Sequence, residues 1–428
     1  MNYKEMSAAA LKDEFKALSE KYNEFKALGL KLDMSRGKPG AEQLDICKNL
    51  PELVDNDNVY SESGVDCRNY GGLDGIPEMK RIFAELFGCP EDNVIIGENS
   101  SLHMMFDIIA QAMSTGLDGE EPWVNQGKVK FLCPSPGYDR HFAVTEYFGI
   151  ENIMIPMTEN GPDMDMVEEY IKDPKVKGIW CVPKYSNPDG VSYSDETVIR
   201  LSEMKPVAND FRIMWDNAYG VHHIYEEKEK QDQVLCLYQE CIKRGTEKRV
   251  LMFMSTSKIT WPGSGVAALC ASSHNIDLMK KRMSFQTIGP DKINQLRHVR
   301  MLRDAAGIEE LMKKHAAIIR PRFELVRDIF EKELAPVGCG RWTNPNGGYF
   351  ISYYAPEGCA KRTVELCKAA GLVTTPAGAS YPYGHDPKDS NIRIAPTYPP
   401  TSELNQALEL FSICARLAYI EKLMANGK

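Results

Sequence analysis

Hydrophobic residues near the N-terminus have the spacing of a helix. Apolar side chains recur there in steps of three or four residues, which is the period of one face of an α-helix. The side chains in this series are Leu11, Phe15, Leu18, Tyr22 and Phe25. The spacing predicts an amphipathic helix over residues 7–28 that packs on the body of the protein. Residues 33–40, which contain glycine, proline and two basic side chains, then form either a plain turn or the edge of a site.

From about Val94 the pattern changes to short apolar runs separated by helical or loop segments. The runs cover residues 94–96, 130–133, 153–156, 178–182, 213–215, 250–254 and 266–271. Such alternation predicts an α/β domain built on a mostly parallel sheet. Because ligands of these sheets bind at the carboxyl ends of the strands, residues that directly follow an apolar run are the first candidates for chemistry.

After about Asp291 the pattern changes again. A long helical stretch covers residues 298–334, with a break expected near Pro321. A strand-like run, a helix, a second strand-like run and a last helix follow, at residues 349–353, 360–370, 391–395 and 402–423. This order predicts a smaller α+β domain. We expect residues 51–300 to form the large domain, with residues 1–50 and 301–428 contributing to the small one.

Length and charge narrow the class of protein. A chain of 428 residues exceeds what one hydrophobic core usually serves, which favours two domains. The net charge of -9 argues against a nucleic-acid binder, since such a protein needs a basic face. No apolar stretch of roughly 20 residues predicts a membrane span, and the N-terminus lacks the apolar core of a secretion signal. The twelve cysteines are scattered without a C-x-x-C pair, which predicts reduced thiols, a cytoplasmic protein and no metal site.

Lys258 is the first candidate for chemistry. It ends the segment Ser255-Thr256-Ser257-Lys258, which directly follows an apolar run. A lysine at the end of a buried strand is costly unless it is paired or used covalently, and desolvation lowers the pKa of such an amine, as in Schiff-base lysines. The hydroxyl groups before it are suited to a phosphate. The alternative is a surface lysine after a strand.

Two other segments place polar groups after predicted strands. Asp216 and Tyr219 follow the run at residues 213–215. The carboxylate of Asp216 suits a protonated pyridine nitrogen, or else it caps the next turn. Ser100 and Ser101 begin a predicted helix, where free backbone N–H groups bind anions, although a plain N-cap has the same sequence.

Asn187 and Arg393 complete this set of candidates. Asn187 belongs to the turn sequence Asn187-Pro188-Asp189-Gly190. Arg393 lies inside a strand-like run without an adjacent acidic residue, so its guanidinium is suited to a carboxylate ligand. Each also has a structural alternative, which is a simple turn for Asn187 and an internal ion pair for Arg393.

In this order and spacing, the segments resemble fold-type-I pyridoxal-5′-phosphate (PLP) enzymes of the aspartate aminotransferase superfamily. The resemblance runs from about Asp33 to the last helix. It is strongest to the bacterial aspartate aminotransferase subgroup related to the catalytic domains of MocR-type regulators. The segments that carry it are Arg68-Asn69-Tyr70-Gly71-Gly72-Leu73-Asp74-Gly75, Pro136-Gly137-Tyr138-Asp139-Arg140-His141-Phe142, residues 183–190 and 255–260, Ile288-Gly289-Pro290-Asp291-Lys292 and Gly347-Gly348-Tyr349-Phe350.

The resemblance implies a fold and a cofactor. The large domain would hold a seven-stranded, mostly parallel sheet between helices, and PLP would be bound at its strand ends. Lys258 would form the Schiff base and shuttle the substrate proton, while Asp216 would keep the pyridine nitrogen protonated. Arg393 would clamp the α-carboxylate of the substrate.

The remaining roles are implied in the same way. Asn187 and Tyr219 would hydrogen-bond the ring hydroxyl, with Asn187 also touching the substrate, and Tyr138 would stack on the ring. Tyr70 would reach the phosphate of the partner subunit, so a homodimer with shared active sites is implied. The residues expected to bind the phosphate are Ser100, Ser101, Ser255 and Ser257.

One position departs from the pattern of the family. Many relatives carry a phosphate-binding arginine eight residues after the Schiff-base lysine, where this chain has Val266. The phosphate must then rely on hydroxyl groups, helix N–H groups, Tyr70 or a base from elsewhere.

The implied substrates are an amino acid and a 2-oxo acid, with L-aspartate and 2-oxoglutarate as the first choice. A dicarboxylic substrate needs a second cation. Arg36 beside Gly37, Arg140 and Lys292 are candidates, and the sequence does not decide among them. An aromatic or neutral amino donor, another PLP reaction such as β-elimination, and a PLP-dependent effector sensor without catalysis are the alternatives. The sensor would need a DNA-binding domain, and only a short stretch precedes Asp33.

Overall fold

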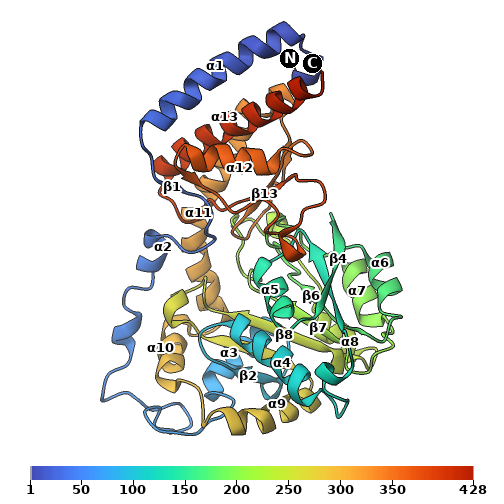
Figure 1. Cartoon of the computed structure of the whole chain (residues 1–428). Helices are drawn as coiled ribbons and strands as arrows, with labels where there is room; N and C mark the ends of the chain where they lie inside the picture. The colour runs from blue at the N-terminus through green and yellow to red at the C-terminus, as the bar shows by residue number, and fades with distance from the viewer. Residues whose placement is uncertain (1, 428) are drawn as a thin grey trace.

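An eight-stranded sheet forms the lower part of the molecule in the computed structural model, which describes residues 2–427 (Figure 1). Its strands lie in the order β2-β9-β8-β7-β6-β3-β4-β5, and β9 and β5 run antiparallel to the rest. They are β2 (Val94–Ile96), β3 (Lys130–Ser135), β4 (Glu151–Thr158), β5 (Gly161–Pro162), β6 (Val176–Cys181), β7 (Arg212–Asp216), β8 (Val250–Ser255) and β9 (Ala267–Ala271). The predicted α/β class with a mostly parallel sheet is confirmed. All seven apolar runs are strands, and the short β5 adds an eighth at the edge.

Helices cover both faces of this sheet (Figure 1). One face carries α3 (Pro77–Phe87), α6 (Met164–Tyr170), α7 (Asp195–Glu203), α8 (Leu237–Ile242) and α10 (Lys292–Leu302). The other carries α4 (Ser101–Thr115), α5 (Asp139–Tyr147) and α9 (Ser273–Gln286). Neighbouring strand residues therefore belong to different cores, as Ile95 and Ile96 do. Because both faces are buried there, strands such as β8 and β9 are apolar along nearly their whole length, whereas β4 alternates between buried and more exposed residues.

A third core lies in the upper part of the molecule, where the two ends of the chain meet (Figure 1). The helix predicted over residues 7–28 is α1, which packs along the C-terminal helix α13. The helices of this part are α1 (Ala8–Ala27), α11 (Ala305–Glu333), α12 (Ala360–Ala369) and α13 (Thr401–Ala425). Its antiparallel sheet contains β10 (Arg341–Trp342), β11 (Ile351–Tyr354) and β13 (Asn391–Ile394), and a separate pair joins β1 (Leu32–Asp33) to β12 (Leu372–Val373). The short helix α2 (Ala41–Asp45) connects the upper part to the lower one.

The break expected near Pro321 is wrong. Helix α11 continues through Pro321, and the chain turns earlier, at Arg303, which has a φ of 66°. The side chain of Asp304 caps the new helix by accepting a hydrogen bond from the N–H of Gly307 at 2.7 Å. Proline removes one backbone donor from a helix, but the buried side chains on either side of it hold α11 in place.

The carboxyl ends of the parallel strands face the upper part of the molecule. Segments that follow these ends contact it directly, since the N–H of Gly137 donates to the carbonyl of Ser380 at 2.7 Å and Tyr354 donates to Asp189 at 2.7 Å. No helix within residues 2–427 is long and apolar enough to cross a bilayer.

Candidate active site

A cavity of about 140 Å³ lies at the carboxyl ends of β6, β7 and β8 and the start of α4. The sequence predicted nine of the residues that line it. These are Ser100, Ser101, Tyr138, Asn187, Asp216, Tyr219, Ser255, Ser257 and Lys258. Apolar side chains complete the wall, namely Leu102, Met105, Val182 and Ala218. The strand-end rule therefore brings residues that are up to 158 positions apart in sequence into one cavity.

Lys258 contributes the amine of this cavity. It follows the end of β8, and its Nζ lies 4.8 Å from the centroid of the Tyr219 ring. Burial of the amine lowers the pKa of Lys258, and the negative charge of Asp216 opposes this shift in part. Removal of an ammonium group from water has this effect because the charged form loses its hydration. The result is an amine that gives up its proton more readily than a surface lysine.

Asp216 contributes a carboxylate with one satisfied and one unsatisfied oxygen. It is the last residue of β7 and is 2% exposed. Its Oδ2 lies 3.1 Å from Nε2 of His141, whereas its Oδ1 is buried and has no hydrogen-bond partner within residues 2–427. A buried carboxylate oxygen without a donor is costly. A ligand with a protonated ring nitrogen, such as the pyridine of PLP, supplies the missing donor.

His141 is the main residue of the site that sequence reasoning missed. Its ring stacks on Trp180 with centroids 4.6 Å apart and an interplanar angle of 12°, and Tyr138 packs against it edge-on at 4.9 Å. This packing fixes the imidazole against Asp216. The signal was present, because His141 lies in the segment that resembles the family and is three residues after Tyr138, on the same side of the helix start.

The end of the cavity near α4 is rich in hydroxyl groups. Ser100 is the N-cap residue of α4, but its side chain makes no capping hydrogen bond, so the plain N-cap alternative is not what the structure has. Ser255 Oγ donates to Ser257 Oγ at 3.0 Å, and Ser257 Oγ donates to the carbonyl of Asn99 at 3.3 Å. Val266 is buried, and no arginine lines this cavity within the described part of the chain. Helix N–H groups and hydroxyls are what the described residues offer an anion here.

Arg393 joins the upper part of the molecule to the cavity wall. It lies on β13, and its Nη1 is 2.9 Å from Oδ1 of Asp139 and 3.2 Å from Oδ1 of Asn187. Its guanidinium lies over the ring of Phe350, at 4.9 Å from the centroid. The internal ion pair considered for Arg393 therefore exists, with a carboxylate 254 residues earlier in the chain. It sits beside the predicted ligand Asn187, so the pairing does not remove Arg393 from the site.

Gly37 packs against the ring of Phe350, the residue that contacts Arg393. A Cβ on this residue would lie 2.0 Å from Cζ of Phe350, so no residue larger than glycine fits without moving the ring. The N-terminal segment thereby contacts the Phe350 ring over which the guanidinium of Arg393 lies.

The other predicted residues lie outside the cavity. Tyr70 is 80% exposed. Arg36 is 65% exposed and lies 3.6 Å from Asp33, and Arg140 is exposed at the start of α5. Lys292 is 4% exposed, and its Nζ donates to the carbonyl of Gly71 at 2.6 Å.

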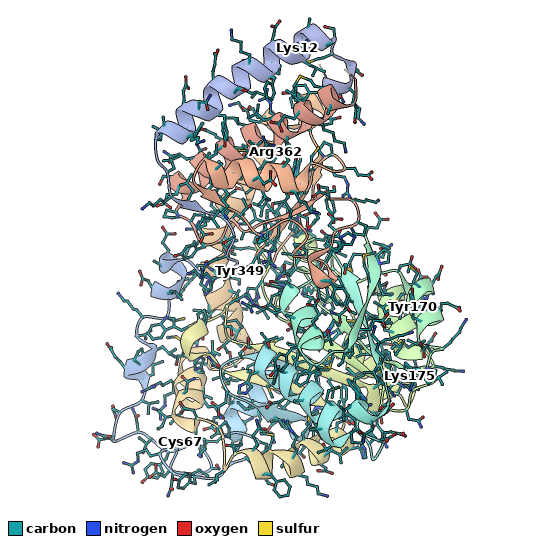
Figure 2. All side chains as sticks on the ribbon, in the orientation of Figure 1. Lys12, Cys67, Tyr170, Lys175, Tyr349 and Arg362 are labelled. Atoms are coloured by element: carbon teal, nitrogen blue, oxygen red, sulfur yellow. The ribbon has the colours of Figure 1, made fainter. Side chains whose placement is uncertain are left out.

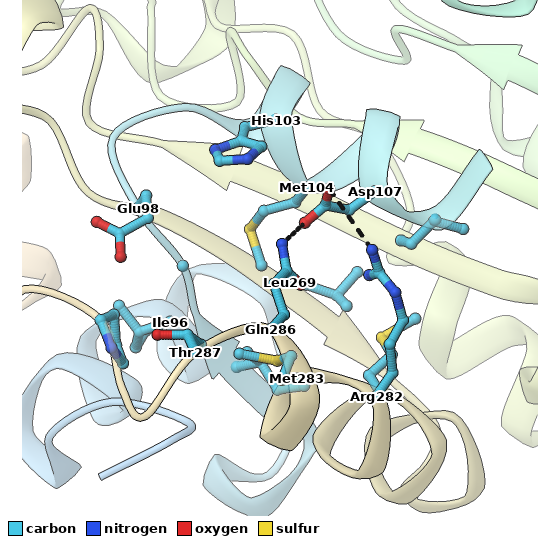
Figure 3. A pocket seen from close by; sticks show the side chains of 15 residues that line it. Ile96, Glu98, His103, Met104, Asp107, Leu269, Arg282, Met283, Gln286 and Thr287 are labelled. Atoms are coloured by element: carbon cyan, nitrogen blue, oxygen red, sulfur yellow. Dashed lines mark hydrogen bonds and ion pairs between the residues drawn. The ribbon is translucent and has the colours of Figure 1, made fainter. Parts of the chain in front are cut away.

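A second cavity of about 240 Å³ lies between α4 and α9 (Figure 3). Its wall is mostly apolar, and Asp107 bridges α4 to α9 through Gln286 at 2.7 Å and Arg282 at 3.6 Å. None of the predicted cofactor residues lines it. The smaller cavity at the strand ends is therefore the candidate active site, because the amine of Lys258, the carboxylate of Asp216 and the serine hydroxyl groups line it and do not line the cavity between α4 and α9.

Residues 6–427 match the family described as aspartate amino-transferase. The chain belongs to this family. An aspartate aminotransferase of Corynebacterium glutamicum is 44% identical over 405 residues, which cover 94% of this chain and 93% of the relative. The crystal structure of an aspartate transaminase from the same species has a TM-score of 0.95 at 42% identity and covers 99% of both chains. The α-aminoadipate aminotransferase LysN of Thermus thermophilus, solved with N-(5′-phosphopyridoxyl)-L-leucine, has a TM-score of 0.73 at 18% identity and supports the fold alone.

The predicted membership in the fold-type-I aminotransferases is thus confirmed, and the enzyme is an aminotransferase. The family match extends over the upper and the lower part alike.

Proposed function

We propose that this enzyme transfers the amino group of L-aspartate to 2-oxoglutarate, with PLP held covalently by Lys258. The observation that carries the proposal is the pairing of groups in one cavity: an amine whose pKa is lowered by burial and a buried carboxylate oxygen that lacks a donor. These are the two anchors that PLP chemistry needs at opposite ends of the ring. The 44% identity to an aspartate aminotransferase supports the choice of substrate.

The residues of the cavity fit PLP in type and arrangement. When bound, PLP supplies an electron sink for the charge that develops on the substrate carbon. Lys258 Nζ would bind its aldehyde carbon, and Asp216 Oδ1 would accept the hydrogen bond of the ring nitrogen. Tyr138 would cover the ring, while Asn187 and Tyr219 would hydrogen-bond the ring hydroxyl. The hydroxyl groups of Ser100, Ser101, Ser255 and Ser257 and the N–H groups of α4 would bind the phosphate.

The same side chains account for proton transfer. A lysine amine whose pKa is lowered by burial gives up its proton more readily than a surface lysine, and its neutral form can accept a proton. Nζ of Lys258 would take the proton from the substrate carbon and return it to the cofactor side. Tyr219, whose ring lies beside Nζ, keeps its own proton, because burial raises the pKa of its hydroxyl group.

Two cations are proposed for the carboxylates of the substrate. Arg393 would bind the α-carboxylate together with Asn187. For the distal carboxylate we favour Arg140, which follows Tyr138 and Asp139 in sequence and makes no ion pair with any described residue. Arg36 has Asp33 nearby, and Lys292 is buried against a carbonyl of its own chain.

A homodimer with shared sites is part of the proposal. Tyr70, Phe285 and Ile288 are 80%, 86% and 64% exposed, which is unusual for large apolar side chains. The loop that carries Tyr70 and the loop that carries Ile288 lie together, because Lys292 donates to the carbonyl of Gly71. This surface is suited to a second copy of the chain, from which Tyr70 would reach the partner's phosphate site.

The test combines a cofactor map with a donor panel. Borohydride reduction of the PLP-loaded enzyme, followed by peptide mapping, should label Lys258. Lys184 is the matched control, since burial also lowers the pKa of its amine, to about 8, yet it does not line the cavity. Lys258→Ala should lose transamination and Lys184→Ala should keep it.

With 2-oxoglutarate as acceptor, aspartate should be the best donor. Label on a residue other than Lys258 would refute the role of the lysine. A donor panel without a preference for aspartate would refute the substrate and leave the aminotransferase chemistry in place.

A further inference from the structure

The backbone carbonyl of Lys258 is contacted by two buried side chains. Its oxygen lies 3.4 Å from Nε2 of His222 and accepts a hydrogen bond from the hydroxyl of Tyr349, also at 3.4 Å. The next carbonyl, that of Ile259, lies 2.9 Å from Nε2 of His315. Figure 2 labels Tyr349 at the level where the upper and lower parts meet. The backbone of Lys258 and Ile259 is therefore held by Tyr349 from the upper part and by His315 from α11.

One buried side chain connects these contacts. Gln43 on α2 is 0% exposed, and its Nε2 lies 2.9 Å from the hydroxyl of Tyr349 and 3.1 Å from Nδ1 of His315. Its Oε1 accepts the N–H of Gly40 at 3.2 Å. An amide nitrogen has two hydrogens, so both are used, one toward each partner. Gln43 is thereby linked by hydrogen bonds to the carbonyl of Lys258 through Tyr349, and to the carbonyl of Ile259 through His315.

The direction of each hydrogen bond follows from the chemistry of the groups. Burial lowers the pKa of His315 to about 4, so its ring is neutral at physiological pH. A carbonyl can only accept, so Nε2 of His315 carries the proton, and Nδ1 must accept from Gln43. Burial raises the pKa of Tyr349, which keeps its proton and donates it to the carbonyl of Lys258. The network has one consistent arrangement of protons, with Gln43 as the double donor.

We propose that Gln43 is a positioning residue for Lys258, which ties the N-terminal segment to the backbone of the catalytic lysine. The same segment carries Gly37, which packs on Phe350 beneath Arg393. Gly37 thus contacts Phe350, on which Arg393 lies. Gln43 contacts Tyr349 and His315, which hydrogen-bond the backbone at Lys258. The inference rests on the proposed role of Lys258 and goes beyond it, because it gives the segment before the large sheet a part in catalysis.

The matched pair of variants is Gln43→Met and Gln295→Met. Methionine keeps the length and volume of glutamine and removes its hydrogen bonds. Gln295 is equally buried, at 1% exposure, and accepts the N–H of Ile76 at 2.9 Å, away from Lys258. Both variants should lose some stability in urea. Only Gln43→Met should lower kcat, by about tenfold, with the KM for aspartate nearly unchanged, since misplacement of a catalytic group acts on the chemical step.

A second readout follows the bound cofactor directly. The pH at which the near-ultraviolet absorbance band of the PLP-loaded enzyme is half converted should shift in Gln43→Met and stay at the wild-type value in Gln295→Met. The groups that face Lys258 are unchanged in both variants, namely Asp216 and Tyr219 at the amine and His222 at the carbonyl. A shift therefore reports on the position of the lysine, which a purely structural role of Gln43 would not alter.

Tyr349→Phe removes a single hydroxyl group and decides the question if Gln43→Met fails to fold. It should lower kcat and shift the pH midpoint of the absorbance band in the same direction as Gln43→Met does. The double variant Gln43→Met/Tyr349→Phe should add little to the larger of the two single effects. Wild-type kcat and midpoint in Gln43→Met, or in Tyr349→Phe when the former does not fold, would overturn the inference. If the wild-type enzyme itself had no such band and no transamination, the proposed function would fall instead.

Discussion

Asp139 and Arg393 form an ion pair of 2.9 Å that joins helix α5 of the lower part to strand β13 of the upper part. Asp139 is the first residue of α5, directly after Tyr138, and its side chain is 35% exposed. Arg393 is 9% exposed and also contacts Asn187. The arginine proposed to bind the substrate α-carboxylate thus already faces a carboxylate of its own chain.

Substrate binding should strengthen when this internal carboxylate is removed. In Asp139→Asn the hydrogen bond can persist, but the negative charge that opposes an incoming carboxylate is gone. Because the pair is partly exposed, we expect about 1 kcal/mol, which is about a fivefold lower KM for aspartate. Steady-state kinetics measure this, with Arg393→Ala as the opposite control, for which KM should rise steeply. A higher KM in Asp139→Asn would mean that Asp139 serves to orient the guanidinium.

Cofactor affinity should depend on His141. In His141→Phe the ring can still stack on Trp180, but Asp216 loses the donor that lies 3.1 Å from its Oδ2. Without this donor Asp216 is held less firmly toward the ring nitrogen, and the loss of about 1–3 kcal/mol should raise the Kd for PLP about 5- to 150-fold. Titration of the apoenzyme with PLP measures it. His298→Phe is the control, since His298 is equally buried but bonds Thr260, and unchanged affinity in His141→Phe would contradict the prediction.

Stability should fall in mild acid because of His315. Burial lowers its pKa from 6.5 to about 4 in the folded enzyme. Between these values the unfolded chain binds the proton and the folded one does not, so the free energy of unfolding decreases as the pH drops from about 6.5 toward 4. One such group contributes a slope of up to about 1.4 kcal/mol per pH unit. Urea unfolding at pH 6 and pH 5, at one protein concentration, measures how the free energy of unfolding changes with pH. This change should be smaller in His315→Gln than in the wild type, and an equal change in both proteins would contradict the prediction.

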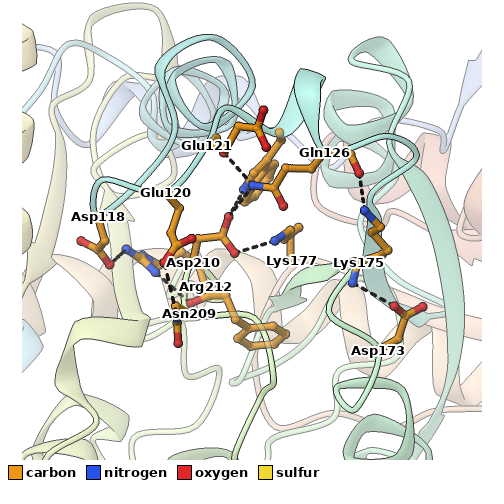
Figure 4. A network of polar contacts seen from close by, with 12 residues as sticks. Asp118, Glu120, Glu121, Gln126, Asp173, Lys175, Lys177, Asn209, Asp210 and Arg212 are labelled. Atoms are coloured by element: carbon orange, nitrogen blue, oxygen red, sulfur yellow. Dashed lines mark hydrogen bonds and ion pairs between the residues drawn. The ribbon is translucent and has the colours of Figure 1, made fainter.

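The amino ends of β6 and β7, away from the cavity, hold a buried ion pair that should matter for stability only (Figure 4). Nζ of Lys177 lies 2.7 Å from Oδ1 of Asp210, both side chains are at most 5% exposed, and Trp123 Nε1 donates to Oδ2 at 2.7 Å. Asp210→Ala leaves a buried ammonium group alone and should cost about 3–5 kcal/mol in unfolding free energy. The kcat of the folded enzyme should not change, because the pair lies at the amino end of β6. The double variant Lys177→Met/Asp210→Leu should regain most of the loss, whereas a cost below about 1 kcal/mol in the single variant would contradict the assignment.

Selectivity for dicarboxylates should depend on Arg140. Loss of a charge-assisted hydrogen-bonded contact costs about 2–3 kcal/mol, so kcat/KM for aspartate should fall about 30- to 150-fold in Arg140→Ala. The value for alanine, which has no distal carboxylate, should change little. The ratio of the two donors is the measurement, and Arg36→Ala is the matched control. If the ratio falls only in Arg36→Ala, the distal cation is Arg36.

Local sequence patterns predicted the strands of the large sheet because most of them, such as β8 and β9, are buried on both faces. All seven apolar runs became strands, with only their ends shifted by a few residues. Where a pattern depends on packing, prediction failed. Pro321 reads as a helix break, yet α11 continues through it because buried neighbours hold the helix in place. The two-residue strand β5 has no signal of its own, since it exists only by pairing with β4.

The same distinction applies to the active site. Strand-end positions and the family resemblance together predicted the polar residues of the site, and nine of them line one cavity. It could not pair His141 with Asp216, 75 residues away, or Asp139 with Arg393, 254 residues away. Such contacts depend on how strand ends and the upper sheet meet in space, which no local spacing encodes.

What the sequence by itself determined is therefore the set of chemical groups and their order along the chain: the amine of Lys258, the carboxylate of Asp216, the hydroxyl groups and the lack of an arginine at Val266. Only the tertiary structure decided which of these groups are buried, which are already paired, and that Gln43 reaches the backbone of Lys258 through Tyr349 and His315. The reason is physical, because residue types set what a side chain can donate or accept, while desolvation and hydrogen bonding depend on neighbours that folding brings from distant parts of the chain.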